Sequence, residues 1–498
     1  MIVMKEDFSL TKEEKRAIVE YKIKKGLPES VGITFGDVYV PERYSDIRSR
    51  AEISDFSVKI AGGLEFGIPF VSANMEPVTG VQMAVGIERE GGLGLLPQTL
   101  PIEDRLYMLE RIKRTDCAFI ENPLEISPEA TLGEAKILMK KFSVSSLILT
   151  KGGKPEGILT HRDWRFEKDE SKKVKSLAGA LGKKLITAPR GTAFKEAEGI
   201  LIKNKIEKLP LLDKSGSLAG LITAHGLFYK ISYPLATRDA KGRFLLAGSI
   251  GVGQHFTDKH LKEVELQAER GIKILLVDTA RAFGVNIKEA IYAIRRDFPG
   301  LILIVGNVSS AEGAKALFEW GAHIVKVNQG RGHVCRTSKM GVGQPQLSAI
   351  AECAVVAKKY GGKIIADGGM KNPGDLVKAV VAGADLLMSG FLLAGTYESA
   401  APIESDENGS LYKTYKGSAS LEAQLERIKN GTLDRIREPE GIAEKVPVTG
   451  SLHDKIRSLM DGMRSAMSYS GVRSLSELKD KGVFELQTEA GLKEGTKR

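Results

Sequence analysis

Eight short apolar runs, most of them followed by an amphipathic helical pattern, constrain the fold of this chain more than any other feature. Each run is nearly continuous in apolar residues, which is typical of strands buried on both faces of a parallel sheet. The runs cover residues 68–75, 92–97, 245–250, 274–280, 301–308, 322–328, 363–369 and 385–390. This repetition predicts an α/β fold, a closed (β/α)8 TIM barrel, and leaves a doubly wound open sheet as the alternative.

One long gap, between the second and third runs, interrupts the pattern and contains an internal repeat. Residues 113–232 read twice as strand, helix, two strands and helix, in halves of about 113–172 and 173–232. A chain of 498 residues also exceeds what one small core can organise. We therefore expect a barrel formed by residues 1–112 and 233–498, with the repeat inserted as a separate domain.

The two halves of the repeat share short sequence patterns. Ile126–Thr131 corresponds to Thr187–Thr192, and Glu156–Thr160 corresponds to Ala219–Thr223. Such pairs resemble tandem domains of the cystathionine-β-synthase (CBS) type, or Bateman domains, which bind adenine nucleotides in the cleft between their halves. The alternative is an insertion with a purely structural role.

The CBS resemblance implies a regulatory site for an adenine or guanine nucleotide in the first half. Thr160–Asp163 matches the pattern in which the threonine and the aspartate hold the ribose and phosphates. In the second half Thr223–Gly226 carries glycine in place of the aspartate. Thr160 and Asp163 are therefore the expected contacts, and the second half does not support a site of its own.

Bulk properties exclude several classes of function. Three cysteines make no disulfide framework, and seven scattered histidines show no zinc-ligand spacing. The net charge of +10 is spread without a basic run interleaved with aromatics, so we expect no nucleic-acid partner. Asp385 and several glycines break the most apolar stretch, and residues 1–7 lack a signal-peptide layout. These features predict a cytoplasmic protein without a membrane anchor.

A single cysteine lies on the glycine-rich loop that follows the sixth apolar run. In Val325–Ser338 an apolar strand leads to Gly330, Gly332 and then Cys335. Glycines at this spacing let backbone amides and carbonyls line a small cavity. A thiol held there could attack an electrophilic carbon, provided that the site stabilises the thiolate. The alternative is a buried cysteine that acts as a small hydrophobe.

Other candidate ligand-binding residues also fall at the ends of the predicted strands, where a barrel forms its active-site face. They are Met75, Asp278, Asn307, Thr337, Asp367, Gly369 and Gly390. Glycine-rich ends of the last two strands form the usual phosphate site of a barrel. An aspartate directly before Gly368 and Gly369 could accept hydrogen bonds from ribose hydroxyls.

This constellation resembles the IMP dehydrogenase and GMP reductase family over nearly the whole chain. Besides the Cys335 loop, the matching segments are Ser72–Met75, Gly91–Gly94, Val277–Ala280, Gly306–Val308, Gly341–Gln346, Asp367–Gly369, Leu393–Thr396, Pro439–Gly441 and Met463–Ser465. A CBS pair inserted at this place matches the dehydrogenases and also some longer reductases. The resemblance implies a homotetramer or octamer.

The resemblance assigns the catalytic roles. Cys335 attacks position 2 of a purine nucleotide, and hydride moves between that carbon and NAD or NADP. Thr337 matches the threonine that positions the attacking group, and Glu440 contacts the base. In the dehydrogenases an Arg-Tyr pair on a mobile flap activates water. The corresponding segment here, residues 397–448, reads as a long irregular stretch, in which Arg435 keeps the arginine but Ile436 follows it.

The resemblance also assigns the binding roles. The substrate-binding set is Met75, Asp367, Gly369, Gly390, Tyr415, Gly417 and Glu440, with Tyr415 at the phosphate. The nicotinamide side is formed by Asp278, Thr279 and Asn307. The carbonyls of Gly330, Gly332 and Cys335 match a monovalent-cation site, filled by K+ in the dehydrogenases.

Several positions depart from the family pattern around the phosphate and the base. In the cysteine loop, Asn328 replaces a glycine and His333 replaces the phosphate-binding serine. Phe391 replaces a second serine, and Ser418 replaces a methionine near the base. The segment Arg281–Phe283 replaces a His-Gly turn. Arg331 or His333 is the candidate cationic substitute at the phosphate.

Two directions of reaction follow from the resemblance. The retained arginine and the CBS insertion slightly favour IMP dehydrogenase, which converts IMP, NAD and water to XMP and NADH. The alternative is GMP reductase, which converts GMP and NADPH to IMP and ammonia without activating water. A third hypothesis is an inactive nucleotide-sensing regulator.

Overall fold

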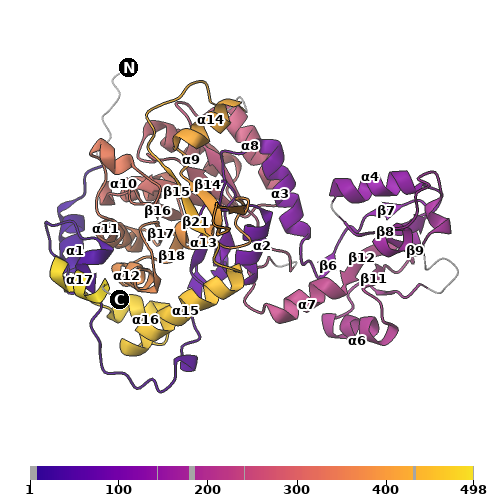
Figure 1. Cartoon of the computed structure of the whole chain (residues 1–498), viewed down its shortest axis with the longest axis horizontal. Coiled ribbons are helices and arrows are strands. Elements are labelled where there is room, and N and C mark those ends of the chain that lie inside the picture. Colours follow the sequence, from indigo (N-terminus) through magenta and orange to yellow (C-terminus); the bar gives the residue numbers. More distant parts are fainter. Residues whose placement is uncertain (1–7, 143, 179–184, 240–241, 430–432, 497–498) are drawn as a thin grey trace. The chain divides into compact units, whose positions relative to one another are not determined.

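The computed structural model describes residues 8–142, 144–178, 185–239, 242–429 and 433–496, and the chain divides into two compact units (Figure 1). Unit 1 comprises the residues up to Leu109, Leu235–Thr237 and the residues from Leu245 on. Unit 2 comprises Glu110–Pro234 and Arg238–Phe244. Residues 1–7, which bear on the signal-peptide argument, and 430–432 of the expected flap lie outside the described residues.

Eight parallel strands form the central sheet of unit 1, in the order β13-β14-β15-β16-β17-β18-β4-β5. They are β4 (Phe70–Ser72), β5 (Leu93–Gly94), β13 (Ala247–Gly251), β14 (Ile274–Asp278), β15 (Ile302–Val308), β16 (Ile324–Val327), β17 (Lys363–Asp367) and β18 (Leu386–Ser389). The order follows the chain and then returns to β4 and β5, as in a barrel and unlike a doubly wound sheet, whose order reverses at a switch point. The TIM-barrel prediction is confirmed.

Helices cover the outer face of this sheet, which explains why its strands read as continuous apolar runs (Figure 1). These helices are α2 (Val81–Arg89), α3 (Ile102–Arg114), α8 (Asp258–Glu269), α9 (Val285–Asp297), α10 (Ala311–Trp320), α11 (Gln346–Lys359), α12 (Pro373–Ala382) and α15 (Leu452–Tyr469), while the short α13 (Phe391–Ala394) follows β18. Leu275, Val305 and Val325 on the central strands are fully buried. Helix boundaries follow ordinary capping: the Ser310 side chain accepts from Gly313 N, and Gly321 ends α10 at φ +117°.

The prediction that residues 397–448 are irregular is wrong. The strands β19 (Glu404–Ser405), β20 (Leu411–Lys416) and β21 (Ala443–Pro447) form a three-stranded antiparallel sheet, and α14 (Leu421–Lys429) follows β20. Lys413 is buried in this sheet, where its Nζ donates to the carbonyl and the hydroxyl of Ser399 at 2.8 and 3.0 Å. A lysine in the middle of a short strand hides the alternation that would reveal it.

The C-terminal segment is ordered against the N-terminal segment of its own chain. After α15 (Leu452–Tyr469) and α16 (Leu475–Lys481), β22 (Glu485–Leu486) pairs antiparallel with β1 (Val38–Tyr39), and α17 (Glu489–Thr496) follows. The sequence suggested a tail that is disordered alone or docks on another subunit; here it docks within the chain. The remaining elements of unit 1 are α1 (Lys12–Lys24) and the hairpin of β2 (Val58–Lys59) and β3 (Glu65–Phe66).

Unit 2 contains the element order strand, helix, two strands and helix twice. The first half has β7 (Glu125–Ile126), α4 (Leu132–Phe142), β8 (Ser146–Lys151), β9 (Lys154–Thr160) and α5 (His161–Trp164). The second has β10 (Ala188–Pro189), α6 (Phe194–Asn204), β11 (Lys208–Leu212), β12 (Leu218–Thr223) and α7 (Ala224–Ser232), and β6 (Phe119–Ile120) joins its sheet. Each half has its own apolar core, one around Leu147 and Leu159, the other around Leu209 and Ile222.

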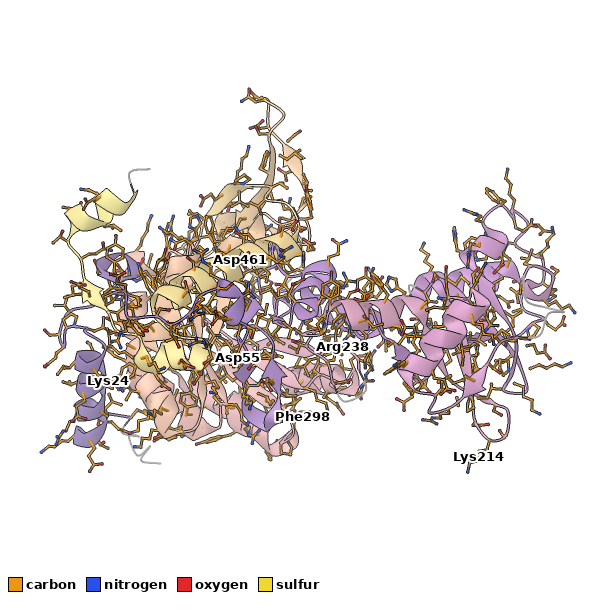
Figure 2. The ribbon with its side chains drawn as sticks, turned by 90° about the horizontal axis from the view of Figure 1, so that it is seen from below. Lys24, Asp55, Lys214, Arg238, Phe298 and Asp461 are labelled. Carbon is orange, nitrogen blue, oxygen red and sulfur yellow. The ribbon has the colours of Figure 1, made fainter. Side chains whose placement is uncertain are left out.

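Charged side chains such as Lys24 in unit 1 and Lys214 in unit 2 are exposed and extend away from the ribbon (Figure 2). Among the described residues no helix is both long and apolar enough to cross a membrane. The same residues contain no group of three or more His, Cys, Asp and Glu side chains arranged to hold a metal ion.

Candidate active site

A cavity of about 320 Å³ opens in unit 1 at the carboxyl ends of the barrel strands. This volume is at the small end of the range for ligand pockets. It brings together the predicted residues Met75, Asp278, Thr279, Asn307, Gly332, Cys335, Thr337, Asp367, Gly369, Gly390, Tyr415, Gly417 and Glu440. Parallel strands end at one edge of the barrel, so residues far apart in sequence meet there.

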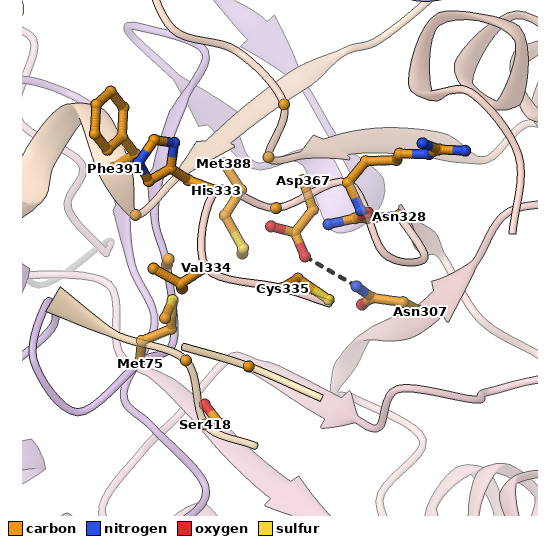
Figure 3. A pocket seen from close by; sticks show the side chains of 18 of the residues that line it. Met75, Asn307, Asn328, His333, Val334, Cys335, Asp367, Met388, Phe391 and Ser418 are labelled. Atoms are coloured by element: carbon orange, nitrogen blue, oxygen red, sulfur yellow. Dashed lines mark hydrogen bonds between the residues drawn. The ribbon is translucent and has the colours of Figure 1, made fainter. Parts of the chain in front are cut away.

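Cys335 opens into this cavity (Figure 3). Its Sγ lies 3.4 Å from Thr337 Oγ1. Its backbone N–H donates to Gly332 O at 3.1 Å, which tightens the loop. The other cysteines, Cys117 and Cys353, are buried, and burial raises the pKa of both thiols. The half-buried Cys335 is therefore the thiol that is placed to meet a ligand.

The flap holds the cysteine loop through the backbone. Cys335 forms a β-bridge with Gly441, and Arg336 N donates to Glu440 O at 2.7 Å. These contacts bring the side chain of Glu440 to the cavity wall. Cys335, the expected nucleophile, and Glu440, the acidic residue expected at the base, are thus positioned by the same pair of segments.

Lys326 is a residue of the cavity lining that motif reasoning missed. It is 4% exposed on β16, and its Nζ lies 3.1 Å from Asp278 Oδ1 and 2.7 Å from Asp367 Oδ2. Asn307 Nδ2 also donates to Asp367 Oδ2, at 3.0 Å (Figure 3). Burial alone would lower the pKa of Lys326, but the two carboxylates outweigh burial and hold it above its ordinary value.

Lys326 therefore fixes the two aspartates expected at the ribose and at the nicotinamide in one ionised cluster. A signal existed in the sequence: a lysine stands within an apolar run of the kind that is buried on both faces. Such a side chain requires a buried partner of opposite charge.

Two aromatic side chains replace the serines expected at the phosphate end of the cavity. The ring of His333 stacks on that of Phe391, with centroids 3.9 Å apart (Figure 3). His333 Nε2 lies 3.0 Å from Glu444 Oε2. Close by, a Cβ on Gly390 would collide with the hydroxyl of Tyr415. Burial, followed by the negative charge of Asp367, raises the pKa of Tyr415, which stays a neutral phenol.

Two predicted residues of the barrel do not line the cavity. Arg435 is exposed on the flap. Gly330 has φ +74°, and a Cβ added there would collide with Ser338 N. The arginine expected to activate water is therefore not beside Cys335 in this conformation.

In unit 2, Thr160 and Asp163 form the capping box of α5. Asp163 Oδ2 accepts from Thr160 N at 2.6 Å and from Thr160 Oγ1 at 2.7 Å. A cavity of about 430 Å³ within the unit is lined by residues of both halves, including Ser146, Lys208 and His225, but not by Thr160 or Asp163. The structure thus gives the predicted pair a local structural role.

Comparison with known proteins gives one consistent relationship. Residues 32–498 match the model of the IMP dehydrogenase / GMP reductase domain. The chain belongs to this family. The inosine-5'-monophosphate dehydrogenase of Aquifex aeolicus is 39% identical, over 96% of this chain and 96% of its own. That of Halalkalibacterium halodurans is also 39% identical, over 93% of this chain and 95% of its own. Members of the family are oxidoreductases that act on purine nucleotides with NAD(P).

A solved structure extends the family relationship to the fold. A GMP reductase variant of Trypanosoma brucei in complex with guanosine 5'-monophosphate has a TM-score of 0.86 and 31% identity. The alignment covers 96% of this chain and 99% of that one. The family is therefore established, and its two named activities are both represented among the similar proteins.

Proposed function

We propose that this chain reduces GMP to IMP through a covalent adduct with Cys335. The observation that carries the proposal is the Cys335 thiol 3.4 Å from the Thr337 hydroxyl, in a cavity that also contains Glu440. The sulfur forms a bond to position 2 of the purine, and the 2-amino group leaves as ammonia after taking a proton. After hydride is added to the same carbon, the C–S bond breaks and returns the thiolate.

Among the residues that the structure describes, the expected water-activating arginine does not line the cavity, which favours this direction over IMP oxidation. Hydrolysis of the adduct requires a base, and Arg435 lies outside the cavity lining without a tyrosine after it. Reduction requires only a proton for the departing amine, which the Thr337 hydroxyl and the Glu440 carboxyl can relay.

The residues on the nicotinamide side fit a dinucleotide. Asn307 Oδ1 is buried and accepts no hydrogen bond within the described part of the chain. A carboxamide N–H would satisfy this oxygen, while Asp278 stays fixed by Lys326. NADPH, when bound, supplies the hydride.

IMP dehydrogenase is the second candidate, because relatives of that name are 39% identical over nearly the whole chain. Purified protein is incubated with GMP plus NADPH, and separately with IMP plus NAD, while the absorbance of the reduced cofactor is followed. Loss of NADPH with GMP supports the reductase, and formation of NADH with IMP overturns it in favour of the dehydrogenase. Turnover in neither mixture would favour an inactive nucleotide sensor.

Arg435→Ala separates the two reactions further. In a reductase the change should leave kcat for GMP within about twofold, because no water is activated. In a dehydrogenase it should leave a rapid first burst of NADH and slow the steady state by about 10²-fold or more. Rapid-mixing kinetics with IMP and NAD, with Lys429→Ala in the same flap as the control, would distinguish these outcomes.

His333 is the side chain that we assign to the substrate phosphate. The other candidate, Arg331, already uses its Nε–H to donate to Gln344 O. His333 lies at the Phe391 end of the cavity, and its partner there is the half-exposed Glu444, which a phosphate could replace. A charge-assisted hydrogen bond contributes roughly 1.5–3 kcal/mol. His333→Ala should therefore weaken GMP binding about tenfold or more in calorimetry and leave guanosine binding unchanged. Equal losses for both ligands would contradict the assignment.

A nucleotide site in unit 2 remains a proposal, with Thr160 and Asp163 as its contacts. Because Asp163 also caps α5, Asp163→Ala should both weaken ATP binding about tenfold and cost about 1 kcal/mol of helix stability. Asp163→Asn, which keeps a capping oxygen, separates the two effects. Calorimetry that finds the same ATP affinity in all three proteins would remove the site.

A further inference from the structure

Arg336, next to the nucleophile, folds back on the loop that carries it. Its Nη1 donates to the carbonyls of His333 and Cys335, each at 3.2 Å. In the part of the chain that the structure describes, the guanidinium forms no ion pair with a carboxylate. Its positive charge is therefore compensated mainly by backbone carbonyls of the cysteine loop.

These contacts compete with the cation that the family resemblance places on Gly330, Gly332 and Cys335. The Cys335 carbonyl already accepts from Arg336, and the Gly332 carbonyl accepts from Cys335 N at 3.1 Å. A monovalent cation on the Cys335 oxygen would be repelled by a positive charge bonded to the same atom. The residues present do not fit a potassium ion there.

We propose that the guanidinium of Arg336 replaces the monovalent cation and holds the Cys335 loop in the form that presents the thiol to the cavity. Guanidinium suits this role because it is planar, permanently charged and has several donors for carbonyl oxygens. Arg336 is a positioning residue, and only its effect on turnover rests on the proposed function. The wild-type protein should need no added K+.

The first test measures the loop without requiring turnover. Protein freed of K+ is alkylated with iodoacetamide in potassium chloride or in choline chloride of equal ionic strength, and the peptide containing Cys335 is quantified by mass spectrometry. The buried Cys117 and Cys353 serve as internal controls. The wild-type rates in the two salts should agree within about twofold, and a tenfold dependence on K+ would overturn the proposal.

Variants of Arg336 supply the opposite case. Arg336→Ala should change the alkylation rate of Cys335 about fivefold or more in choline chloride, with potassium chloride restoring part of the wild-type rate. Arg336→Lys keeps the charge and should stay near wild type in both salts. Lys339→Ala, which removes an exposed cation of the same loop, is the matched control. An Arg336→Ala protein that behaves as wild type in both salts would overturn the proposal.

Turnover gives an independent readout once a substrate pair is established. Wild-type kcat should be the same in both salts, and Arg336→Ala should gain a dependence on K+. If neither GMP nor IMP turns over, the proposed reaction fails while the alkylation result still decides the role of Arg336. If Arg336→Ala does not fold, the wild-type comparison and Arg336→Lys decide it.

Discussion

Replacing Cys335 by serine is expected to abolish turnover, by about 10³-fold or more, while the barrel stays folded. A serine hydroxyl needs a base to become a nucleophile, and the neighbour at 3.4 Å is itself a hydroxyl, that of Thr337. The thiol needs only a modest stabilisation of its thiolate. The measurement is steady-state turnover with the active substrate pair, together with the unfolding temperature and nucleotide affinity of the variant.

Cys353→Ala is the matched control, since this thiol is buried away from the cavity and should be dispensable for turnover. A Cys335→Ser protein that keeps more than about a tenth of the wild-type rate would show that the reaction does not proceed through this sulfur.

Lys326→Met should lower the free energy of unfolding by about 3–5 kcal/mol, because it leaves two half-buried carboxylates without their shared, fully enclosed cation. Methionine keeps the length of the lysine stem, so the loss reports charge rather than packing. Urea unfolding followed by fluorescence measures the change. Turnover should fall as well, since Asp278 and Asp367 would no longer be held in place.

A triple variant tests the cause of that loss. With Asp278→Asn and Asp367→Asn already present, adding Lys326→Met should cost far less than it does in the wild-type protein. If the single Lys326→Met change costs under about 1 kcal/mol, the cluster is not a source of stability.

The barrel was predictable because its strands are buried on both faces. Each strand therefore needs apolar residues at nearly every position, which appear in the sequence as a continuous run. The same logic placed Asp278, Asn307 and Asp367 together, since parallel strands end at one rim. The strands of the flap were missed because β20 carries the buried Lys413, whose partners are carbonyl and hydroxyl groups of an earlier segment.

Lys326 and Arg336 show what a linear pattern does not contain. Lys326 reads as an interruption of a strand until the strands on either side supply Asp278 and Asp367. Arg336 binds main-chain carbonyls, and every residue has one, so no sequence motif marks its partners. Departures at His333 and Phe391 were visible, but their stacking required the structure.

Unit 1 is built from segments that precede and follow unit 2 in the sequence, and this affects the order of folding during synthesis. Strands β4 and β5 are synthesised early, but β4 pairs with β18, which is synthesised late. Strand β1 likewise pairs with β22, near the end of the chain. Unit 2, with a local core in each half, can fold as soon as it leaves the ribosome. The early strands of the barrel must meanwhile be kept from wrong partners, which makes nascent chains that stop before β18 the species most exposed to aggregation and most dependent on chaperones.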